Sequence, residues 1–199
     1  MGRIVVSENV SLDGVVQDPA GDEGFRVGGW VGRGAGDRGA VGDRGREEAA
    51  EVLLDEALGA EALLFGRRSY EYLGSRWSSR SGELADRLNS LPKYVISSTL
   101  EDPAWNNSTV LKGDVVDEVS KLKQEIDGEI VVYASFHLLR TLMKHDLVDE
   151  LRLMVYPVVL GAGERLFGET SDTKPMRLVD ARTVAGDLAF LTYDPVRDA

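Results

Sequence analysis

Short apolar segments alternate with amphipathic segments along most of this chain, and this alternation limits the possible folds more than any other feature. Apolar runs such as Ala62–Phe65 and Glu129–Tyr133 are typical of buried strands. Arg46–Leu58, in contrast, has apolar residues at helical spacing and acidic residues on its other side. Strands that alternate with helices predict a mostly parallel sheet with helices on both faces.

The last part of the chain contains only strand-like segments. Met176–Arg182 and Leu188–Tyr193 flank Gly186-Asp187 and predict a closing hairpin. Asp149–Val159 predicts a long strand whose later part, at Pro157, is an edge or a bend. We therefore expect an α/β fold: a mostly parallel central sheet flanked by helices, with an antiparallel C-terminal edge. No repeat or linker stands out, so residues 1–199 are expected to form one domain. The remaining expected strands are Arg3–Ser7, Tyr94–Ser98 and Val110–Leu111, and the remaining expected helices are one from Ser69, Glu83–Leu91, Asp114–Ile126 and Leu138–Lys144, with Asp114 and Ser135 as N-caps.

The composition excludes several classes of function. A formal net charge of −11 argues against nucleic acid or an anionic membrane as the main partner. The chain has no cysteine, which excludes disulfides, thiolate metal sites and cysteine nucleophiles, and only two histidines, so we expect no metal site. We see no signal peptide and no apolar run of membrane-spanning length, and we therefore expect a cytoplasmic protein.

Residues 18–46 are rich in glycine interleaved with arginine and aspartate. Such a stretch cannot bury enough apolar surface to fold alone, so it predicts a long, mobile loop. Two interpretations stay open: a tolerated surface insertion, or a lid over a ligand. Trp30, a large aromatic residue in this polar stretch, is the reason to retain the lid.

Polar groups that suit a phosphate follow two of the expected strands. Gly66-Arg67-Arg68-Ser69 comes directly after Ala62–Phe65, and Ser97-Ser98-Thr99 ends the strand that begins at Tyr94. Guanidinium groups, hydroxyls and the N–H groups of a helix N-terminus all bind phosphate. In open α/β sheets, ligands bind outside the carboxyl ends of the strands. The pair predicts a site for a phosphate-rich cofactor, most simply a dinucleotide.

Basic residues also exceed acidic ones locally, between Gly66 and Ser98. This excess suits a small anionic ligand, although a solvated helix face would account for part of it. The basic residues are Arg67, Arg68, Arg76, Arg80, Arg87 and Lys93.

Four motifs, in this order, resemble the dihydrofolate reductase-like superfamily. They are Ser11-Leu12-Asp13-Gly14, Gly66-Arg67-Arg68-Ser69-Tyr70-Glu71, Leu91–Ser98, and the run VDELRLMVYPVVLGAGERLF from Val148 to Phe167. The branch that the chain resembles most is the reductase domain of bacterial riboflavin biosynthesis, the C-terminal half of the bifunctional deaminase-reductase. The resemblance extends from about Arg3 to Tyr193 and weakens only in the glycine-rich loop.

This resemblance implies an NADPH-binding reductase. Gly66, Arg67, Arg68 and Ser69 match the motif that holds the cofactor's adenosine phosphates, and Ser97 and Ser98 match positions that contact the 2′-phosphate. Ala134, Ser135, Phe136 and His137 match the glycine-rich turn under the pyrophosphate and nicotinamide. The chain departs from the family here, because Ala134-Ser135 stands where a Gly-Gly or Gly-Ser pair is usual.

The resemblance also implies a proton donor, because reduction of a C=N bond requires a proton on nitrogen. Glu51 is nearest the family's spacing, and Asp13 lies in the turn that closes over the nicotinamide in family members. The alternative for Glu51 is a solvated helix face, and the alternative for Asp13 is a turn former. Gly161 and Gly163 match a loop that borders the substrate pocket or the dimer interface, or they form a plain turn.

We expect a reductase that transfers hydride from NADPH to a small pterin-like, pyrimidine-like or other conjugated substrate. The resemblance further implies a homodimer formed through the C-terminal strands. The alternative is a protein that kept the fold to bind a nucleotide or another small ligand and lost the chemistry.

Overall fold

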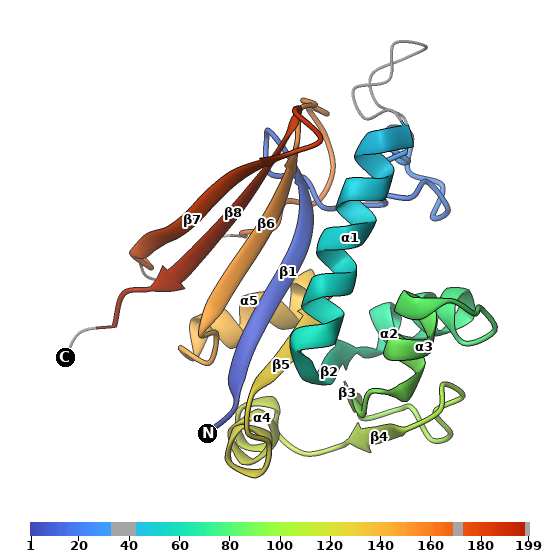
Figure 1. Cartoon of the computed structure of the whole chain (residues 1–199). Helices are drawn as coiled ribbons and strands as arrows, with labels where there is room; N and C mark the ends of the chain where they lie inside the picture. The colour runs from blue at the N-terminus through green and yellow to red at the C-terminus, as the bar shows by residue number, and fades with distance from the viewer. Residues whose placement is uncertain (33–42, 169–172, 198–199) are drawn as a thin grey trace. The chain divides into compact units, whose positions relative to one another are not determined.

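The structure is a computed structural model that describes residues 1–32, 43–168 and 173–197 (Figure 1). Its strands form a mixed sheet in the order β4-β3-β2-β5-β1-β6-β8-β7. The strands are β1 (Arg3–Ser11), β2 (Ala60–Gly66), β3 (Lys93–Ile96), β4 (Ser108–Leu111), β5 (Glu129–Tyr133), β6 (Glu150–Tyr156), β7 (Met176–Val184) and β8 (Leu188–Pro195). The helices are α1 (Asp43–Gly59), α2 (Arg67–Trp77), α3 (Glu83–Ser90), α4 (Val115–Glu125) and α5 (Phe136–Lys144).

The strand directions confirm the predicted fold class. β2 runs parallel to both β3 and β5, and β3 runs parallel to β4. β8 is antiparallel to β6 and β7, which gives the expected antiparallel C-terminal edge. The element boundaries differ where side-chain pattern alone was the guide: β1 continues to Ser11, and β6 ends at Tyr156, directly before Pro157. Proline has no N–H to offer a sheet partner, which accounts for that end.

Backbone contacts group the chain into two compact units. The first consists of Met1–Val6 and Val52–Glu150, and the second consists of Ser7–Glu51 and Leu151–Ala199. The single domain expected from the sequence stays a prediction. In the described residues, no helix is both long and apolar enough to cross a membrane.

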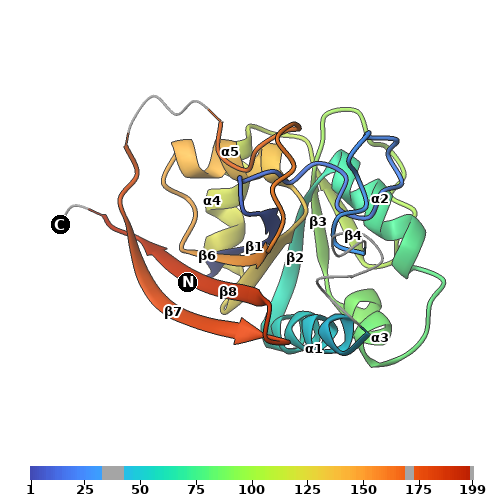
Figure 2. The same ribbon diagram turned by 90° about the horizontal axis from the view of Figure 1, so that it is seen from above.

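The core of the first unit has an aromatic centre. Phe65 of β2 stacks on Trp105 at 6.0 Å between ring centroids, and Tyr70 of α2 lies 6.1 Å from Trp105. Leu63, Val95, Val131 and the apolar residues of α2 and α3 pack around them. Figure 2 shows α4 and α5 on the opposite side of the strands from α3. The helix–strand alternation of the sequence therefore becomes a sheet covered on both faces.

A buried lysine completes this core. Lys93, the first residue of β3, is 0% exposed, and its ammonium donates to the carbonyls of Asn89, Leu91 and Asn106 at 2.8–3.2 Å. The ammonium also lies 4.7 Å from the centre of the Trp105 ring, a cation–π contact. Burial lowers the pKa of Lys93 to about 8. The hydrogen bonds and the ring replace the water that the charged group loses.

Several hydrogen bonds and a ring contact hold residues 18–32, and the predicted mobility of this loop stays a prediction. Asp18 is 2% exposed, and its carboxylate accepts the backbone N–H groups of Glu23 and Phe25 at 3.1 and 3.0 Å. Trp30 is also buried: its indole N–H donates to the Gln17 carbonyl, and its ring meets the Tyr156 ring edge-on at 5.5 Å. Residues 33–42, the rest of the predicted loop up to the start of α1, lie outside the described residues. The hypothesis of a lid therefore stays a prediction.

Substitution of Gly28 tests the order of this loop. A Cβ at Gly28 would lie 2.3 Å from Asp18 Oδ2, so Gly28→Ala forces the buried carboxylate away from its N–H donors. We expect Gly28→Ala to lower the free energy of unfolding by about 1–3 kcal/mol in urea denaturation, the usual cost of overpacking. Gly32→Ala is the matched control, because among the described residues its Cβ would meet one atom, at 3.9 Å. Equal stability of the two variants would contradict an ordered loop built around Asp18.

Candidate functional site

The carboxyl ends of three parallel strands carry the candidate cofactor residues. Register pairs Gly66 with Ile96 and Leu63 with Val131, so β3, β2 and β5 end side by side. All ten residues assigned to the cofactor from the sequence lie at or directly after these ends within the first unit. They are Gly66 as the last residue of β2, Arg67, Arg68 and Ser69 after it, Ser97 and Ser98 after β3, and Ala134, Ser135, Phe136 and His137 after β5. Their binding of a cofactor stays a prediction.

Arg67 links two of these strand ends. Its guanidinium is exposed, with Nε 2.8 Å from Glu71 Oε1 and Nη1 donating to Thr99 Oγ1 at 2.6 Å. The first residue of α2 is therefore joined to the segment after β3. Thr99 was missing from the residues assigned to the cofactor, although it is the third hydroxyl of the Ser97-Ser98-Thr99 run and could have been included on that ground.

The hydroxyls after β3 fall into two groups. Ser97 is buried, and its Oγ accepts the N–H groups of Thr99 and Leu100 at 3.3 and 3.0 Å. It therefore shapes the turn after β3. Ser98 and Thr99 are exposed. The exposed pair is better placed than Ser97 to meet a ligand from solvent.

The turn after β5 is held to the start of α2. The Ser69 hydroxyl donates to the Ala134 carbonyl at 2.6 Å, and the Gly66 N–H donates to Ser135 Oγ at 3.2 Å. Ala134 has a φ of 53°, the left-handed region that favours glycine, so the chain keeps a glycine-like turn without the glycine. Ser135 occupies the N-cap position of α5 as expected, but it makes no side-chain cap bond there. The expected cap interaction is wrong because the hydroxyl serves Gly66 instead.

Phe136 and His137 begin α5. Their rings lie 4.3 Å apart between centroids, and the Arg140 guanidinium lies 5.3 Å from the centre of the Phe136 ring. His137 is exposed, whereas Phe136 is partly buried. These side chains place an aromatic surface beside the turn.

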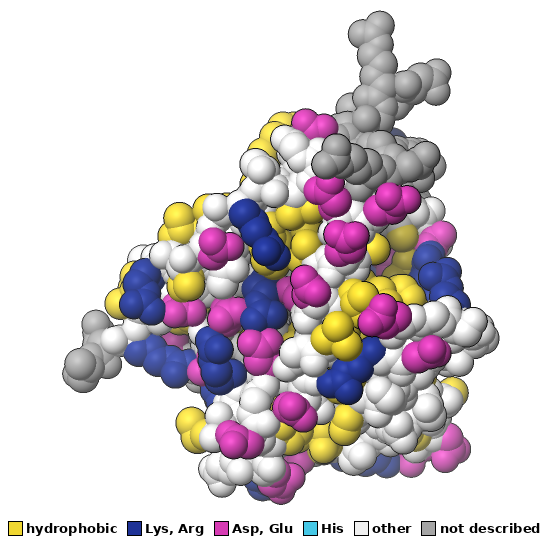
Figure 3. Space-filling view, in the orientation of Figure 1, with side chains coloured by type: hydrophobic (Ala, Val, Ile, Leu, Met, Phe, Trp, Pro, Cys, Tyr) yellow, Lys and Arg dark blue, Asp and Glu magenta, His cyan; other side chains and the backbone are white. Residues whose placement is uncertain are grey.

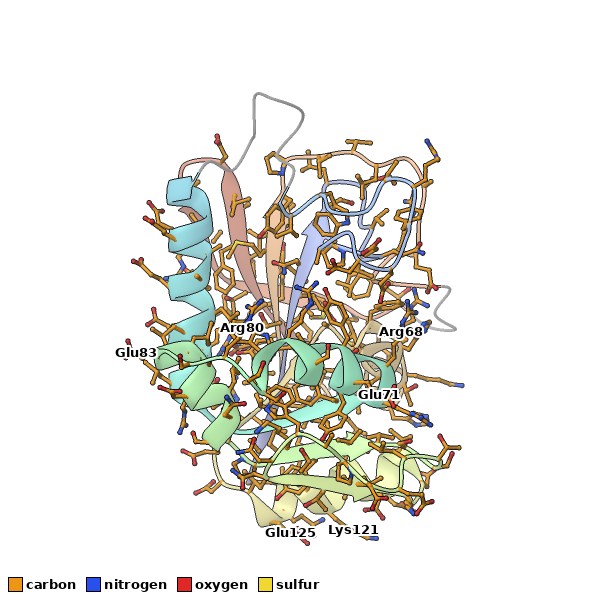
Figure 4. All side chains as sticks on the ribbon, turned by 90° about the vertical axis from the view of Figure 1, so that its right-hand side faces the viewer. Arg68, Glu71, Arg80, Glu83, Lys121 and Glu125 are labelled. Atoms are coloured by element: carbon orange, nitrogen blue, oxygen red, sulfur yellow. The ribbon has the colours of Figure 1, made fainter. Side chains whose placement is uncertain are left out.

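Several of the basic residues between Gly66 and Ser98 make contacts within the protein, and the assignment of the local basic excess to a ligand stays a prediction. Arg87 donates to the Ala57 and Ala60 carbonyls at 3.0 and 2.6 Å, and Lys93 is buried. Arg76 and Arg80 lie over the Tyr72 and Trp77 rings. Figure 4 shows Arg68 and Glu71 toward one end of α2 and Arg80 with Glu83 beyond its other end. On the face drawn in Figure 3, Lys and Arg side chains are interspersed with Asp and Glu.

Asp13 lies in the second unit and ties two loops together. Its carboxylate accepts the Ser11 hydroxyl at 2.7 Å and the N–H groups of Leu160 and Gly161 at 3.1 and 2.9 Å. The Ser11 hydroxyl, followed by these backbone donors, lowers the pKa of Asp13 to about 2 against the opposing effect of burial. A carboxylate ionised to such low pH is a poor proton donor near neutrality, so the geometry favours a loop-organising role for Asp13.

The same two loops are joined by backbone bonds. Leu12 N–H donates to Val158, Val16 N–H to Glu164 and Leu166 N–H to Gly14, at 2.8–2.9 Å. Gly163 lies at their closest approach: its φ is 112°, and a Cβ there would lie 2.8 Å from Val15 and 2.9 Å from Phe25. A side chain at position 163 would therefore disturb this approach, and a role of Gly161 and Gly163 beside a substrate or a dimer interface stays a prediction.

Glu51 lies on α1 with an exposed side chain. Another acid of this helix, Glu48, accepts the N–H of Ala185 at 2.5 Å and so holds the turn of the β7–β8 hairpin. Among the described residues, no group of three or more His, Asp or Glu side chains is arranged to hold a metal ion. The assignment of Glu51 as proton donor stays a prediction, and its exposure does not favour it.

Substitution of Asp13 by asparagine tests the loop-organising role. The lowered pKa means that ionised Asp13 stabilises the fold fully above about pH 4 and that this contribution is lost as the pH falls toward about 2. We expect Asp13→Asn to lower the free energy of unfolding by about 1–3 kcal/mol at neutral pH. Urea denaturation from pH 7 down to pH 2 should show the difference from wild type shrinking with acidity. Asp180→Asn, on the exposed strand β7, is the control; a pH-independent difference for Asp13→Asn would contradict the role.

Known proteins resemble the chain in sequence and in fold. The family model for the RibD C-terminal domain matches residues 3–190. "Uncharacterized protein YyaP" of Bacillus subtilis (strain 168) is 30% identical over 138 residues, which cover 67% of this chain and 73% of the relative.

Solved structures share the fold at low sequence identity. The "Putative riboflavin biosynthesis protein" of Shewanella sp. PV-4 has a TM-score of 0.72 at 22% identity, over 98% of this chain and 99% of the other. Dihydrofolate reductase from Enterococcus faecalis, solved with NADP(H), has a TM-score of 0.57 at 12% identity, over 97% of this chain and 96% of the other. The expected dihydrofolate reductase-like fold is confirmed, and with a family model that matches nearly its whole length, the chain belongs to the RibD C-terminal domain family.

Proposed function

We propose that this protein is an NADPH-dependent reductase that transfers hydride to a small conjugated substrate of the pterin or pyrimidine type. One observation carries the proposal: three parallel strands end side by side, and their ends bring together Arg67, the exposed hydroxyls of Ser98 and Thr99, and the turn at Ala134-Ser135. Membership of a reductase family supports the chemistry.

The charge distribution at this edge favours NADPH over NADH. The 2′-phosphate of NADPH is a compact anion, and arginine binds phosphate oxygens with paired N–H donors. Arg67 is held by Glu71 and Thr99 in a fixed position beside Ser98, so little conformational entropy is lost when it binds a phosphate. Arg68, the next residue of α2, adds a second exposed cation.

When bound, NADPH supplies the hydride, and the protein's residues bind it, orient it and exclude water. The turn at Ala134-Ser135 and the aromatic pair Phe136 and His137 border the pyrophosphate and nicotinamide end in this proposal. Asp13 fixes the loop that carries Leu160 and Gly161. Because Asp13 is ionised at neutral pH and Glu51 is exposed, a bound water is the better source of the substrate's proton.

Membership of the family supports this substrate class. The Shewanella protein with the same fold is described as a "Putative riboflavin biosynthesis protein".

We also propose a homodimer formed through the C-terminal strands. The edge strand β7 is exposed along nearly its whole length, including Leu178 and Val179 at 52% and 53%, which suits such an interface.

A second candidate function is ligand binding without catalysis. The departure from the family at Ala134 favours it, because the added methyl group would crowd a close approach of a cofactor to the turn. The two candidates differ in one property: a reductase consumes NADPH when a suitable acceptor is present, and a binding protein does not.

Titration with NADPH and NADH, followed by quenching of tryptophan fluorescence, tests the cofactor site. We expect NADPH to bind more tightly than NADH. Arg67→Ala should weaken NADPH binding by about tenfold and Ser98→Ala by about threefold, because hydrogen bonds that involve a charged group contribute more than neutral ones. NADH should be affected less by both substitutions. Arg80→Ala is the matched control, because Arg80 lies over the Trp77 ring.

Two outcomes would overturn parts of the proposal. Failure of the wild-type protein to bind either nucleotide would exclude the reductase function. Tight NADPH binding without loss of NADPH absorbance, across a panel of pterin and pyrimidine acceptors, would favour the non-catalytic candidate.

A further inference from the structure

Two hydrogen bonds form a closed link between the start of α2 and the turn after β5. Ser69 Oγ donates to the Ala134 carbonyl at 2.6 Å, and Gly66 N–H donates to Ser135 Oγ at 3.2 Å. We propose that Ser69 is a positioning residue: its hydroxyl holds Ala134 in the left-handed conformation and thereby orients the turn that leads into α5. The expected effect of Ser69 on cofactor binding rests on the proposed function, whereas its effect on the turn does not depend on any cofactor.

Proton counting separates this role from phosphate binding. A serine hydroxyl carries one proton, and that of Ser69 is donated to the Ala134 carbonyl. The oxygen that remains has only lone pairs to offer, and a phosphate requires donors. The single proton of the Gly66 N–H is likewise donated to Ser135. Phosphate binding at the start of α2 therefore falls to Arg67 and Arg68 and to other N–H groups of the first helical turn.

The conformation of Ala134 explains why such a link is needed. A residue with a Cβ enters the left-handed region at a cost that glycine does not have. Of the five described non-glycine residues with positive φ, three are Asp or Asn, which tolerate this region, and the other two are Ala134 and Ala185. Each of these alanines is bonded by a side chain: Ala185 by Glu48 and Ala134 by Ser69.

The link also sets the direction of the next N–H group. In a planar trans peptide, the carbonyl and the following N–H point in opposite directions. With the Ala134 carbonyl directed to Ser69, the Ser135 N–H is directed away from α2. The Ser135 carbonyl accepts the Leu139 N–H at 2.9 Å, so the same residue starts the hydrogen bonding of α5. Ser69 thus fixes the orientation of both the turn and the helix N-terminus beside it.

A set of variants distinguishes positioning from direct binding. They are Ser69→Ala, Ala134→Gly, the double variant, Ser69→Thr, and Ser75→Ala as the matched control on the same helix, where Ser75 donates to the Tyr72 carbonyl. We expect Ser69→Ala to lower Tm by about 3 °C, because one hydrogen bond is lost. We also expect it to weaken NADPH binding about tenfold, because the turn is released. Ser69→Thr keeps the hydroxyl and should retain both properties, as should the control.

The double variant is decisive. Glycine at position 134 adopts the left-handed conformation without support, so Ala134→Gly in the Ser69→Ala background should restore NADPH affinity to within about twofold of wild type. If the double variant binds as weakly as Ser69→Ala, Ser69 is a direct ligand and the proposal is wrong. Since glycine requires no support, the double variant also keeps the test open should Ser69→Ala fail to fold.

The unliganded protein gives a readout that does not depend on NADPH. In thermal unfolding, the Tm loss caused by Ser69→Ala should be smaller in the Ala134→Gly background than in the wild-type background, since only alanine needs the link. Equal losses in the two backgrounds would overturn the positioning role. If wild-type protein does not bind NADPH, the proposed function fails, yet this comparison still decides the role of Ser69.

Discussion

The parallel pairing of β2 with β3 and β5 is the constraint on which the candidate site depends. Because the side chains of a strand repeat every two residues, the register that pairs Leu63 with Lys93 and Val131 also decides which residues emerge together at the strand ends. The buried faces of these strands set that register through Phe65, Val95 and their neighbours. Core packing therefore places the polar groups that follow the strands at the same edge of the sheet. They do not all have to contact one another for this.

A second feature is that the protein's own groups satisfy much of the hydrogen-bonding capacity at this edge. The Ser97 hydroxyl accepts a backbone N–H of its own turn, and the Ser69 hydroxyl donates to the Ala134 carbonyl. The Glu71 carboxylate neutralises part of the charge of Arg67. Such internal bonds hold the strand ends in place before any ligand arrives, which reduces the ordering that binding requires. They also divide the residues carried over from the family into those that hold the edge together and those that face solvent.

The sequence predicted the fold well because its signals are local. The apolar run Glu129–Tyr133 and the turn at Gly186-Asp187 depend on near neighbours, and both elements lie where they were expected. It also identified the strand ends that carry the candidate cofactor residues. The partners of individual polar groups could not be predicted, because they are distant in the chain: Asp13 bonds to Leu160 and Gly161, and Ser69 bonds to Ala134. The burial of Lys93 was also missed, since charged residues are assigned to the surface unless a buried partner is known.

The burial of Lys93 has a practical consequence for studying motion in this protein. Its amine is enclosed by three carbonyls and the Trp105 ring, so an amine-reactive reagent in solution can modify it only when this part of the core opens. The other lysines with an exposed ammonium would react at once and could be blocked first. The rate at which Lys93 then acquires a label would report how often this part of the core opens, without any change to the sequence.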